Sequence, residues 1–371
     1  MDPMIPKKAA ATTPAFENSL EAQAPATDIT SPRDAAFQEA RRELDSLVGM
    51  TTAKNQIYNL LGSALVATQQ GQSPDSNCNI VLTGSTGSGK STVAHIFGKL
   101  LSSTGFLEKG HVVTTSPLAL VSPFVGGTET NLSEAFKKAA GGILFIDDIF
   151  PLTPHEMVEL GRAFNLLRAR MEQEDGERVV VVLAGDQESI DALFTEGQGL
   201  ANKFSQQLHL PDYSPAEMTM MSKQLLQNWN IDIPDEFYTR ALVLASIMAL
   251  EENPSRWNGR FARDEIVDGS IRQMANRVMP NNPLPIPEEL KRIQATDLPF
   301  ERLTGIPWSL IDLNQLQWEL TRENGDVIPM DADTVGKYFA NMTDHRVLDD
   351  GQPELTPASK EYLAELMRSV P

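Results

Sequence analysis

The sequence contains little material for a disulfide framework, a metal cluster or a membrane span. Its 371 residues include one cysteine, Cys78, and five histidines, which excludes an internal disulfide and a Cys-rich zinc site. No apolar run reaches the ~20 residues that cross a bilayer, and the N-terminal segment lacks the apolar region of a signal peptide. We therefore expect a soluble, cytoplasmic protein with no membrane partner.

Basic residues are also scarce relative to acidic ones. Lys and Arg together number 31 and Asp and Glu number 50, so the formal net charge is −19. Binding to the phosphates of DNA or RNA needs clustered Lys and Arg. Nucleic acid is therefore an unfavoured partner, although a local basic groove would be compatible with this charge. The apolar fraction of 41% is sufficient for a buried core.

The pattern along the chain predicts four segments. Residues 1–33 are rich in Ala, Pro, Thr and Ser and predict a disordered tail. Residues 34–212 alternate short apolar runs with helical patterns, which indicates an α/β domain with a parallel sheet flanked by helices. Residues 213–279 carry helical patterns only and predict a small all-helical domain. Residues 280–371 form an acidic C-terminal extension with enough large apolar residues to fold.

The α/β segment contains several short runs typical of buried strands. The strongest is 179–184, which is continuously apolar, as expected for a strand covered on both faces. The strands expected are 80–83, 111–115, 142–147 and 178–185. The helices expected between and after them are 90–104, 130–140 and 154–174.

The strongest motif is a phosphate-binding loop. Residues 84–91 read GSTGSGKS, the complete G-x-x-x-x-G-K-S pattern between an expected strand and an expected helix. The glycines let backbone N–H groups surround a phosphate, and the helix N-terminus adds its positive end. We expect Lys90 to neutralise the β and γ phosphates of ATP, Ser91 to bind Mg²⁺ and Thr92 to lie near the α-phosphate. The expected nucleotide-binding residues are Gly84, Ser85, Thr86, Gly87, Ser88, Gly89, Lys90, Ser91 and Thr92.

A pair of acids follows another expected strand. Residues 142–148 read GILFIDD, so Asp147 would emerge at the carboxyl edge of the sheet, where ligands bind in such folds. Asp147 would hold Mg²⁺ through water, and Asp148 would polarise the attacking water. The alternative interpretation is that the two acids cap the next helix.

These motifs and the phrases around them resemble the AAA+ ATPases, in the branch of the CbbX rubisco activase and stage V sporulation protein K. The resemblance extends from about residue 44 to residue 278. A phosphate loop alone occurs in many folds, but the order of all the phrases is far more specific. The phrases are 47–50 (LVGM), 110–111 (GH), 124–128 (FVGGT), 140–148 (AGGILFIDD), 183–185 (LAG), 210–213 (LPDY) and 258–263 (NGRFAR).

The resemblance implies a chaperone-like ATP hydrolase that assembles into a homo-oligomeric ring, commonly a hexamer. In such a ring ATP and Mg²⁺ bind at subunit boundaries, and a protein substrate is remodelled or threaded through the pore. Carried over by position, Val48 and Gly49 would lie beside the adenine. Arg260 would reach the γ-phosphate from the helical lid, with Arg263 a weaker candidate for nucleotide or neighbour contact. The alternative for Arg260 is a solvated helix arginine.

The resemblance also implies a substrate-gripping pore loop at Phe124, Val125 and Gly126. An aromatic side chain gives a large contact area at a small cost in side-chain entropy. The alternative is that Phe124 is an aromatic anchor in the core. The sequence names no particular protein substrate.

Three positions depart from the family pattern. Asp148 stands where a glutamate is usual, and misplacement of a catalytic group by about 1 Å can cost ~10²-fold in rate. Asp186 occupies the first-sensor position, where a neutral polar residue is common. Lys203 stands where related proteins carry an arginine finger, and lysine lacks the planar fork that suits phosphate oxygens. Arg168 and Arg170 are the alternatives for that function.

The leading hypothesis is an ATP-dependent remodelling ATPase whose catalytic residues are Asp148, Lys203, Asp186 and Arg260. The alternative is a nucleotide-gated scaffold with very slow or no ATP hydrolysis, which the departures at Asp148 and Lys203 favour. A kinase is disfavoured because it does not explain the phrases at 124–128 and 258–263. A DNA-handling motor is disfavoured by the net charge of −19.

Overall fold

The computed structural model describes most of the chain after residue 31. The described ranges are 32–69, 78–124, 126–149, 152–171, 178–197, 199–204, 206–251, 258–279 and 288–369. The expected disordered tail falls almost wholly outside these ranges, as do Val125 and the Pro-rich stretch at 280–287.

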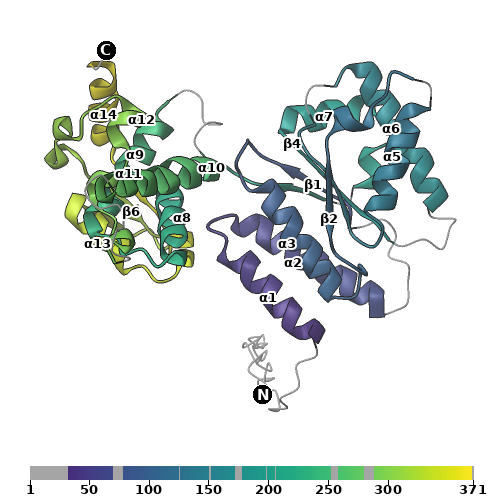
Figure 1. Cartoon of the computed structure of the whole chain (residues 1–371), viewed down its shortest axis with the longest axis horizontal. Helices are drawn as coiled ribbons and strands as arrows, with labels where there is room; N and C mark the ends of the chain where they lie inside the picture. The colour runs from purple at the N-terminus through teal and green to yellow at the C-terminus, as the bar shows by residue number, and fades with distance from the viewer. Residues whose placement is uncertain are drawn as a thin grey trace, which may run out of the picture.

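A five-stranded parallel sheet forms the centre of one half of the molecule (Figure 1). Its strand order is β2-β3-β4-β1-β5, and every neighbouring pair is parallel. The four strands expected from the sequence are present. The fifth was not predicted, because β5 reads Gln-Gln-Leu-His and buries only Leu208. The strands are β1 (Ile80–Thr83), β2 (Val112–Thr115), β3 (Ile143–Ile146), β4 (Val180–Gly185) and β5 (Gln206–His209).

Helices cover both faces of this sheet. Successive strand side chains point to opposite faces, so β1 places Ile80 and Leu82 in one hydrophobic cluster and Val81 in the other. The first cluster includes α1 (Pro32–Ser46), α2 (Thr51–Gln69) and α3 (Lys90–Ser103). The second includes α4 (Pro117–Leu120), α5 (Gly127–Lys138), α6 (Pro154–Met171) and α7 (Gln187–Glu196). The α/β fold class is therefore confirmed.

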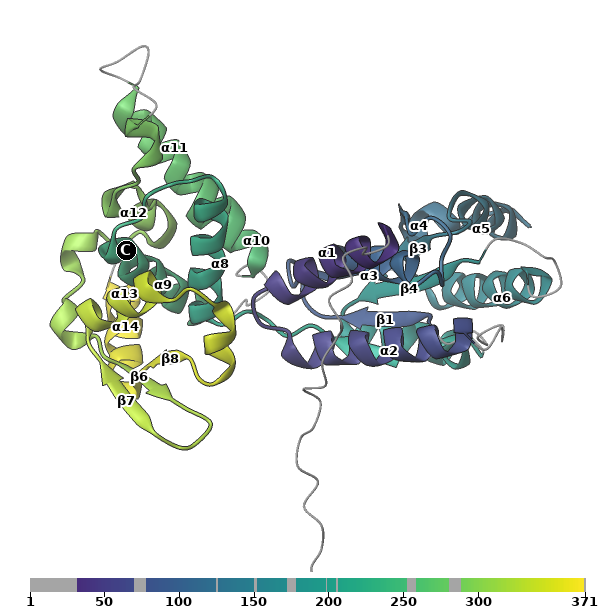
Figure 2. The same cartoon turned by 90° about the horizontal axis from the view of Figure 1, so that it is seen from below.

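A helical lid follows the last strand of the sheet. The lid consists of α8 (Pro215–Asn228), α9 (Asp235–Ala249), α10 (Gly259–Phe261), a π-helical segment (Ala262–Val267) and α11 (Asp268–Val278). The start of α8 is strongly specified, because Ser214 accepts a hydrogen bond from the Glu217 N–H and the Glu217 carboxylate accepts one from the Ser214 N–H. Figure 2 shows the lid helices grouped on one side of the molecule and the parallel sheet on the other.

The C-terminal extension folds onto the lid. Its antiparallel sheet has the order β7-β6-β8, and Trp318 and Phe339 are fully buried in the same hydrophobic cluster as the lid helices. The elements are α12 (Phe300–Thr304), β6 (Trp318–Thr321), β7 (Val327–Met330), α13 (Ala332–Asn341), β8 (Pro353–Leu355) and α14 (Pro357–Ser369). The lid and the extension therefore share a core, which continues into the cluster on one face of the parallel sheet.

A buried lysine joins the extension to the lid. Lys223 of α8 is 2% exposed, and its Nζ donates to the carbonyl oxygens of Phe339 at 2.7 Å, Ala340 at 2.9 Å and Met342 at 2.7 Å. These carbonyls lie at the C-terminus of α13, where backbone acceptors lack intrahelical partners and a positive charge is favoured. The ammonium thus satisfies a buried helix end that would otherwise lack donors.

Candidate functional site

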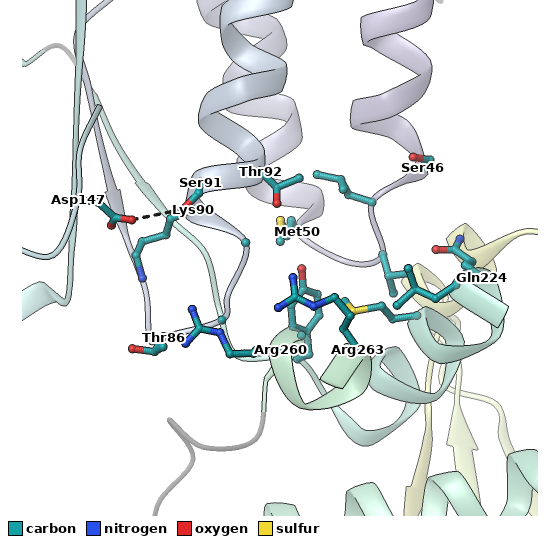
Figure 3. A pocket seen from close by; sticks show the side chains of 18 of the residues that line it. Ser46, Met50, Thr86, Lys90, Ser91, Thr92, Asp147, Gln224, Arg260 and Arg263 are labelled. Carbon is teal, nitrogen blue, oxygen red and sulfur yellow. Dashed lines mark hydrogen bonds between the residues drawn. The ribbon is translucent and has the colours of Figure 1, made fainter. Parts of the chain in front are cut away.

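A cavity of about 560 Å³ lies between the carboxyl edge of the parallel sheet and the helical lid. Figure 3 shows its side chains arriving from α3, from the chain before α2 and from the lid. The lining residues from the sheet half are Ser46, Leu47, Val48, Met50, Thr86, Gly87, Gly89, Lys90, Ser91, Thr92, Asp147 and Asp148. Those from the lid and the connection before it are Tyr213, Met221, Gln224, Leu225, Asn228, Gly259, Arg260 and Arg263.

The phosphate loop has a backbone that requires glycine. Gly87 and Gly89 have φ of 83° and 95°, a region that L side chains rarely adopt. A Cβ at Gly89 would also lie 2.8 Å from Met50 Cε. Gly89 is the N-cap of α3 and supplies no side-chain hydrogen bond, so the first-turn N–H groups of α3 remain donors for an anion. The loop and its helix therefore fit a phosphate group.

The side chains of Lys90 and Ser88 are enclosed by the phosphate loop. Lys90 Nζ donates to the carbonyl oxygens of Gly84 and Ser85, both at 2.8 Å. Burial lowers the pKa of the Lys90 ammonium, and the carboxylates of Asp147 and Asp148 oppose this shift. The Ser88 hydroxyl is fully buried and has no hydrogen-bond partner among the described residues. The loop therefore combines a positive charge with an unsatisfied polar group.

The structure brings together Ser91, in the first turn of α3, and Asp147, directly after β3. Ser91 Oγ donates to Asp147 Oδ2 at 3.3 Å, drawn as the dashed line in Figure 3. Burial raises the pKa of the Asp147 carboxyl. Within the described ranges no group of three or more His, Cys, Asp or Glu side chains could hold a metal. A hydroxyl and one carboxylate nevertheless fit Mg²⁺, which usually takes its remaining ligands from water and substrate phosphates.

Asp148 has an unusual backbone conformation. Its φ is 56°, one of few positive values at non-glycine residues in the described part of the chain, and its side chain is exposed at the cavity. Among non-glycine residues, Asp and Asn adopt this left-handed region most readily because their short side chains bond locally. The conformation gives a physical reason for aspartate at a position where the longer glutamate was expected.

Asp186 and Lys203 do not line the cavity of their own chain. Asp186 is the N-cap of α7, and its two carboxylate oxygens accept hydrogen bonds from the Ser189 N–H at 2.8 Å and hydroxyl at 2.7 Å. Burial acts to raise the pKa of the Asp186 carboxyl, but these hydrogen bonds outweigh burial and lower the pKa. Lys203 ends a short 3-10 helix (Ala201–Lys203), and its carbonyl oxygen accepts from Asn79 Nδ2 at 3.1 Å. Their catalytic functions stay predictions.

Both lid arginines reach the cavity. Figure 3 shows Arg260 and Arg263 extending into it from the lid. Arg263 Nε pairs with Asp264 Oδ1 at 2.7 Å. The backbone next to Arg260 contacts the phosphate loop, since a Cβ at Gly87 would lie 3.2 Å from Arg260 Cβ. The side chains of Arg168 and Arg170 lie outside the described residues.

The sequence did not predict the lid wall of the cavity. Met221, Gln224 and Leu225 share one face of α8, because residues three and four apart are neighbours on a helix. Their spacing signals an amphipathic face, but nothing in the sequence says that this face meets Val48. Gly49 does not line the cavity, and a Cβ there would collide with the Glu217 carboxylate.

The expected pore-loop aromatic lies far from the core. The Phe124 side chain is 79% exposed, more than any other large hydrophobic side chain in the described ranges. Gly126 has φ of 77° and is the N-cap of α5, and the Gly127 N–H donates to the Phe124 carbonyl oxygen at 2.9 Å. The interpretation of Phe124 as a core anchor is wrong for this chain.

Comparisons with known proteins agree with these features. The family model of the ATPase family associated with various cellular activities (AAA) matches residues 80–209. The chloroplastic ribulose bisphosphate carboxylase/oxygenase activase of Cyanidioschyzon merolae is 30% identical over 282 residues, covering 74% of this chain and 95% of that protein. Stage V sporulation protein K of Bacillus subtilis is 27% identical over 268 residues, covering 71% and 82%. A CfxQ homolog of Cyanidium caldarium is 28% identical over 256 residues, covering 67% and 88%.

In the part of the chain that the structure describes, no helix combines the length and the apolar character that a membrane crossing needs. The family match covers the five parallel strands, the phosphate loop and Asp147, and the first relative is similar along nearly its whole length. The chain therefore belongs to the AAA family of ATPases, in the branch that contains the rubisco activase, the CfxQ homologues and stage V sporulation protein K.

Proposed function

We propose that the protein hydrolyses ATP in this cavity and uses the energy to remodel a protein substrate in a ring. The single observation that carries the proposal is the convergence of Lys90, Ser91, Asp147 and Arg260 on one cavity. These residues come from the phosphate loop, a second strand end and the lid. A nucleotide bound there would contact both halves of the molecule.

Each group has a chemical task suited to its position. Lys90 and the N–H groups of the first turn of α3 would bind the β and γ phosphates. Ser91 and Asp147 would hold Mg²⁺, which neutralises phosphate charge when bound. Asp148, exposed at the cavity, would orient and polarise the attacking water. The apolar side chains of Val48, Met50, Met221 and Leu225 would enclose the adenine.

The shared core of lid and extension supports a particular motion. Because α12 and α13 of the extension pack against α9 of the lid and Lys223 of α8 bonds to the end of α13, we propose that the lid and the extension move together as one body. Nucleotide binding would rotate this body relative to residues 34–212, with the connection near residue 212 as the hinge. Rigid-body motion of this kind is a common way to convert ligand binding into mechanical work.

The half-buried Lys203 and the exposed Phe124 support assembly into a ring. Lys203 lies outside its own cavity, so we propose that it completes the site of a neighbouring subunit, where it would stabilise transition-state charge. Phe124 is 79% exposed, and we propose that it grips an extended polypeptide in the central channel. A hexameric ring and a cytoplasmic location are part of this proposal.

A second candidate is a nucleotide-gated scaffold with very slow or no hydrolysis. The observation that favours it is the left-handed backbone of Asp148, with φ of 56°, combined with lysine in place of arginine at position 203. Both features would reduce the rate of the chemical step without reducing nucleotide affinity.

One experiment separates the two candidates and tests the substrate class. Phosphate release from ATP is measured for the purified full-length protein, with and without denatured casein as a polypeptide probe. A remodelling ATPase should show steady turnover that casein changes, and Phe124→Ala should abolish the response while basal turnover stays. Leu118→Ala is the matched control, because Leu118 is also exposed, at 58%, in the chain between β2 and α5. Turnover no faster than ATP in water would establish the scaffold and contradict the proposal.

A further inference from the structure

Three polar side chains from distant parts of the chain meet beside the phosphate loop. Asn258 Nδ2 donates to Ser85 Oγ at 2.5 Å and to Asp212 Oδ1 at 2.7 Å. The Ser85 hydroxyl in turn donates to the same oxygen of Asp212. We call Ser85, Asp212 and Asn258 the Asn258 network. It joins the phosphate loop, the connection between β5 and α8, and the lid.

Asn258 has no freedom to adopt another arrangement without loss. Its residue is 1% exposed. Both amide hydrogens are used in the network, and Oδ1 accepts from the Tyr213 N–H at 2.9 Å. A buried amide that loses one of these partners is left with an unsatisfied polar atom, which is costly. The orientation of this side chain is therefore fixed by the loop and the connection together.

The backbone around Asn258 lies against the phosphate loop. A Cβ at Gly87 would be 3.2 Å from the Cβ atoms of both Asn258 and Arg260, and a Cβ at Gly259 would be 3.0 Å from the carbonyl oxygen of Gly87. Two glycines thus permit the close approach of lid and loop. Arg260 follows Asn258 by two residues. An interaction that holds Asn258 in place therefore also holds the backbone position from which the Arg260 side chain extends.

We infer that Asn258 is a positioning residue that holds Arg260 over the phosphate loop and transmits the state of the loop to the lid through Ser85 and Asp212. The inference rests on the proposed function, in which Arg260 contacts the γ-phosphate. Its chemical consequence is specific. The network strengthens the binding of ATP more than that of ADP, because only ATP carries the group that Arg260 contacts.

The test is a charge swap measured by nucleotide affinity. Asn258→Asp places a second carboxylate against Asp212 and should weaken ATP binding by about 10-fold more than ADP binding, similar to Arg260→Ala. Adding Asp212→Asn restores one amide and one carboxylate, and the double variant should recover at least half of that loss on a logarithmic scale. Asn131→Asp is the matched control, since the Asn131 amide also donates two hydrogen bonds, here to the backbone carbonyls of Ala119 and Leu120, and Asn131 does not line the cavity.

The outcomes distinguish this inference from the proposed function. If Arg260→Ala removes the preference for ATP but Asn258→Asp leaves it intact, the inference is wrong and the function stands. If Asn258→Asp weakens ATP and ADP equally, or the swap restores nothing, Asn258 is only structural. If wild-type protein shows no preference for ATP over ADP, the γ-phosphate contact itself fails, and the inference fails with it.

A second variant covers the case in which Asn258→Asp does not fold. Ser85→Ala removes the loop member of the network while leaving the amide its bond to Asp212. It should reduce the ratio of ATP to ADP affinity in the same direction, by about threefold. An unchanged ratio would overturn the inference.

Discussion

The parallel sheet and the C-terminal sheet are built on different principles. In the parallel sheet, β1, β3 and β4 are buried on both faces, as is usual when helices cover each side. In the C-terminal sheet, β6 alternates buried and exposed residues, and β7 buries only Met330. The parallel sheet is therefore covered on both faces, whereas the C-terminal sheet keeps one face exposed and packs its buried side chains in the same hydrophobic cluster as the lid.

The two regions also differ in how far apart their key partners lie in the sequence. The phosphate loop and its helix are contiguous, so the residues that would surround a phosphate, 84–92, are neighbours in the sequence. The extension depends on Lys223, which caps a helix more than a hundred residues further along the chain. A local motif therefore builds the phosphate loop, while contacts distant in sequence complete the cavity and attach the extension to the lid.

The largest expected effect is at the local site. Lys90→Ala removes the charge that would face the phosphates and should weaken ATP binding at least about 1,000-fold, equivalent to about 4 kcal/mol. Titration calorimetry measures it. Lys99→Ala is the matched control, because Lys99 is on the same helix but pairs with Glu43 at the surface. Unchanged ATP affinity in Lys90→Ala would contradict the assignment of the loop.

The next effect tests the attachment of the extension. Lys223→Met leaves the carbonyls at the end of α13 without a donor and should lower the free energy of unfolding by about 3 kcal/mol. Denaturant unfolding measures it. Lys337→Met is the control, since Lys337 forms an exposed pair with Asp333 on α13 and should change stability little. Equal effects of the two variants would mean that the buried ammonium does not hold the extension.

A third prediction concerns the chemical step. Asp148→Asn should keep ATP affinity but lower kcat by about 10²-fold, the usual contribution of a general base. Asp148→Glu should not raise kcat above wild type, because the longer side chain is less compatible with the left-handed backbone. Phosphate-release assays measure both variants. A kcat within twofold of wild type for Asp148→Asn would place the water-activating group elsewhere.

The smallest expected effect is at the boundary between subunits. Lys203→Arg should raise kcat by about 10-fold, because a planar guanidinium directs two hydrogen bonds to phosphate oxygens. Lys203→Ala should lower kcat and leave ATP affinity nearly unchanged. If Arg168→Ala or Arg170→Ala abolishes turnover while Lys203→Ala leaves kcat unchanged, the residue that acts as the arginine finger lies on α6. If none of the three alanine substitutions changes kcat, the result would favour the nucleotide-gated scaffold.

Sequence reasoning succeeded where neighbours in the sequence are also neighbours in space. It found four of the five parallel strands, because their apolar runs are continuous. It did not predict β5, because this edge strand has mostly polar, exposed side chains and no continuous apolar run. It placed Lys90, Ser91 and Asp147 correctly at one edge of a sheet, since the carboxyl ends of parallel strands meet there. It did not find Met221, Gln224 and Leu225, whose spacing signals only an amphipathic helix.

The sequence by itself determined the glycine-rich loop, the helix that follows it and the acid at the end of a buried strand. Each depends on contiguous residues and on backbone preferences that act locally. The tertiary structure alone decided which lid face closes the cavity and that Asn258 meets Ser85 and Asp212. These contacts join residues far apart in the chain, and their geometry is fixed only when the sheet, the lid and the extension pack together.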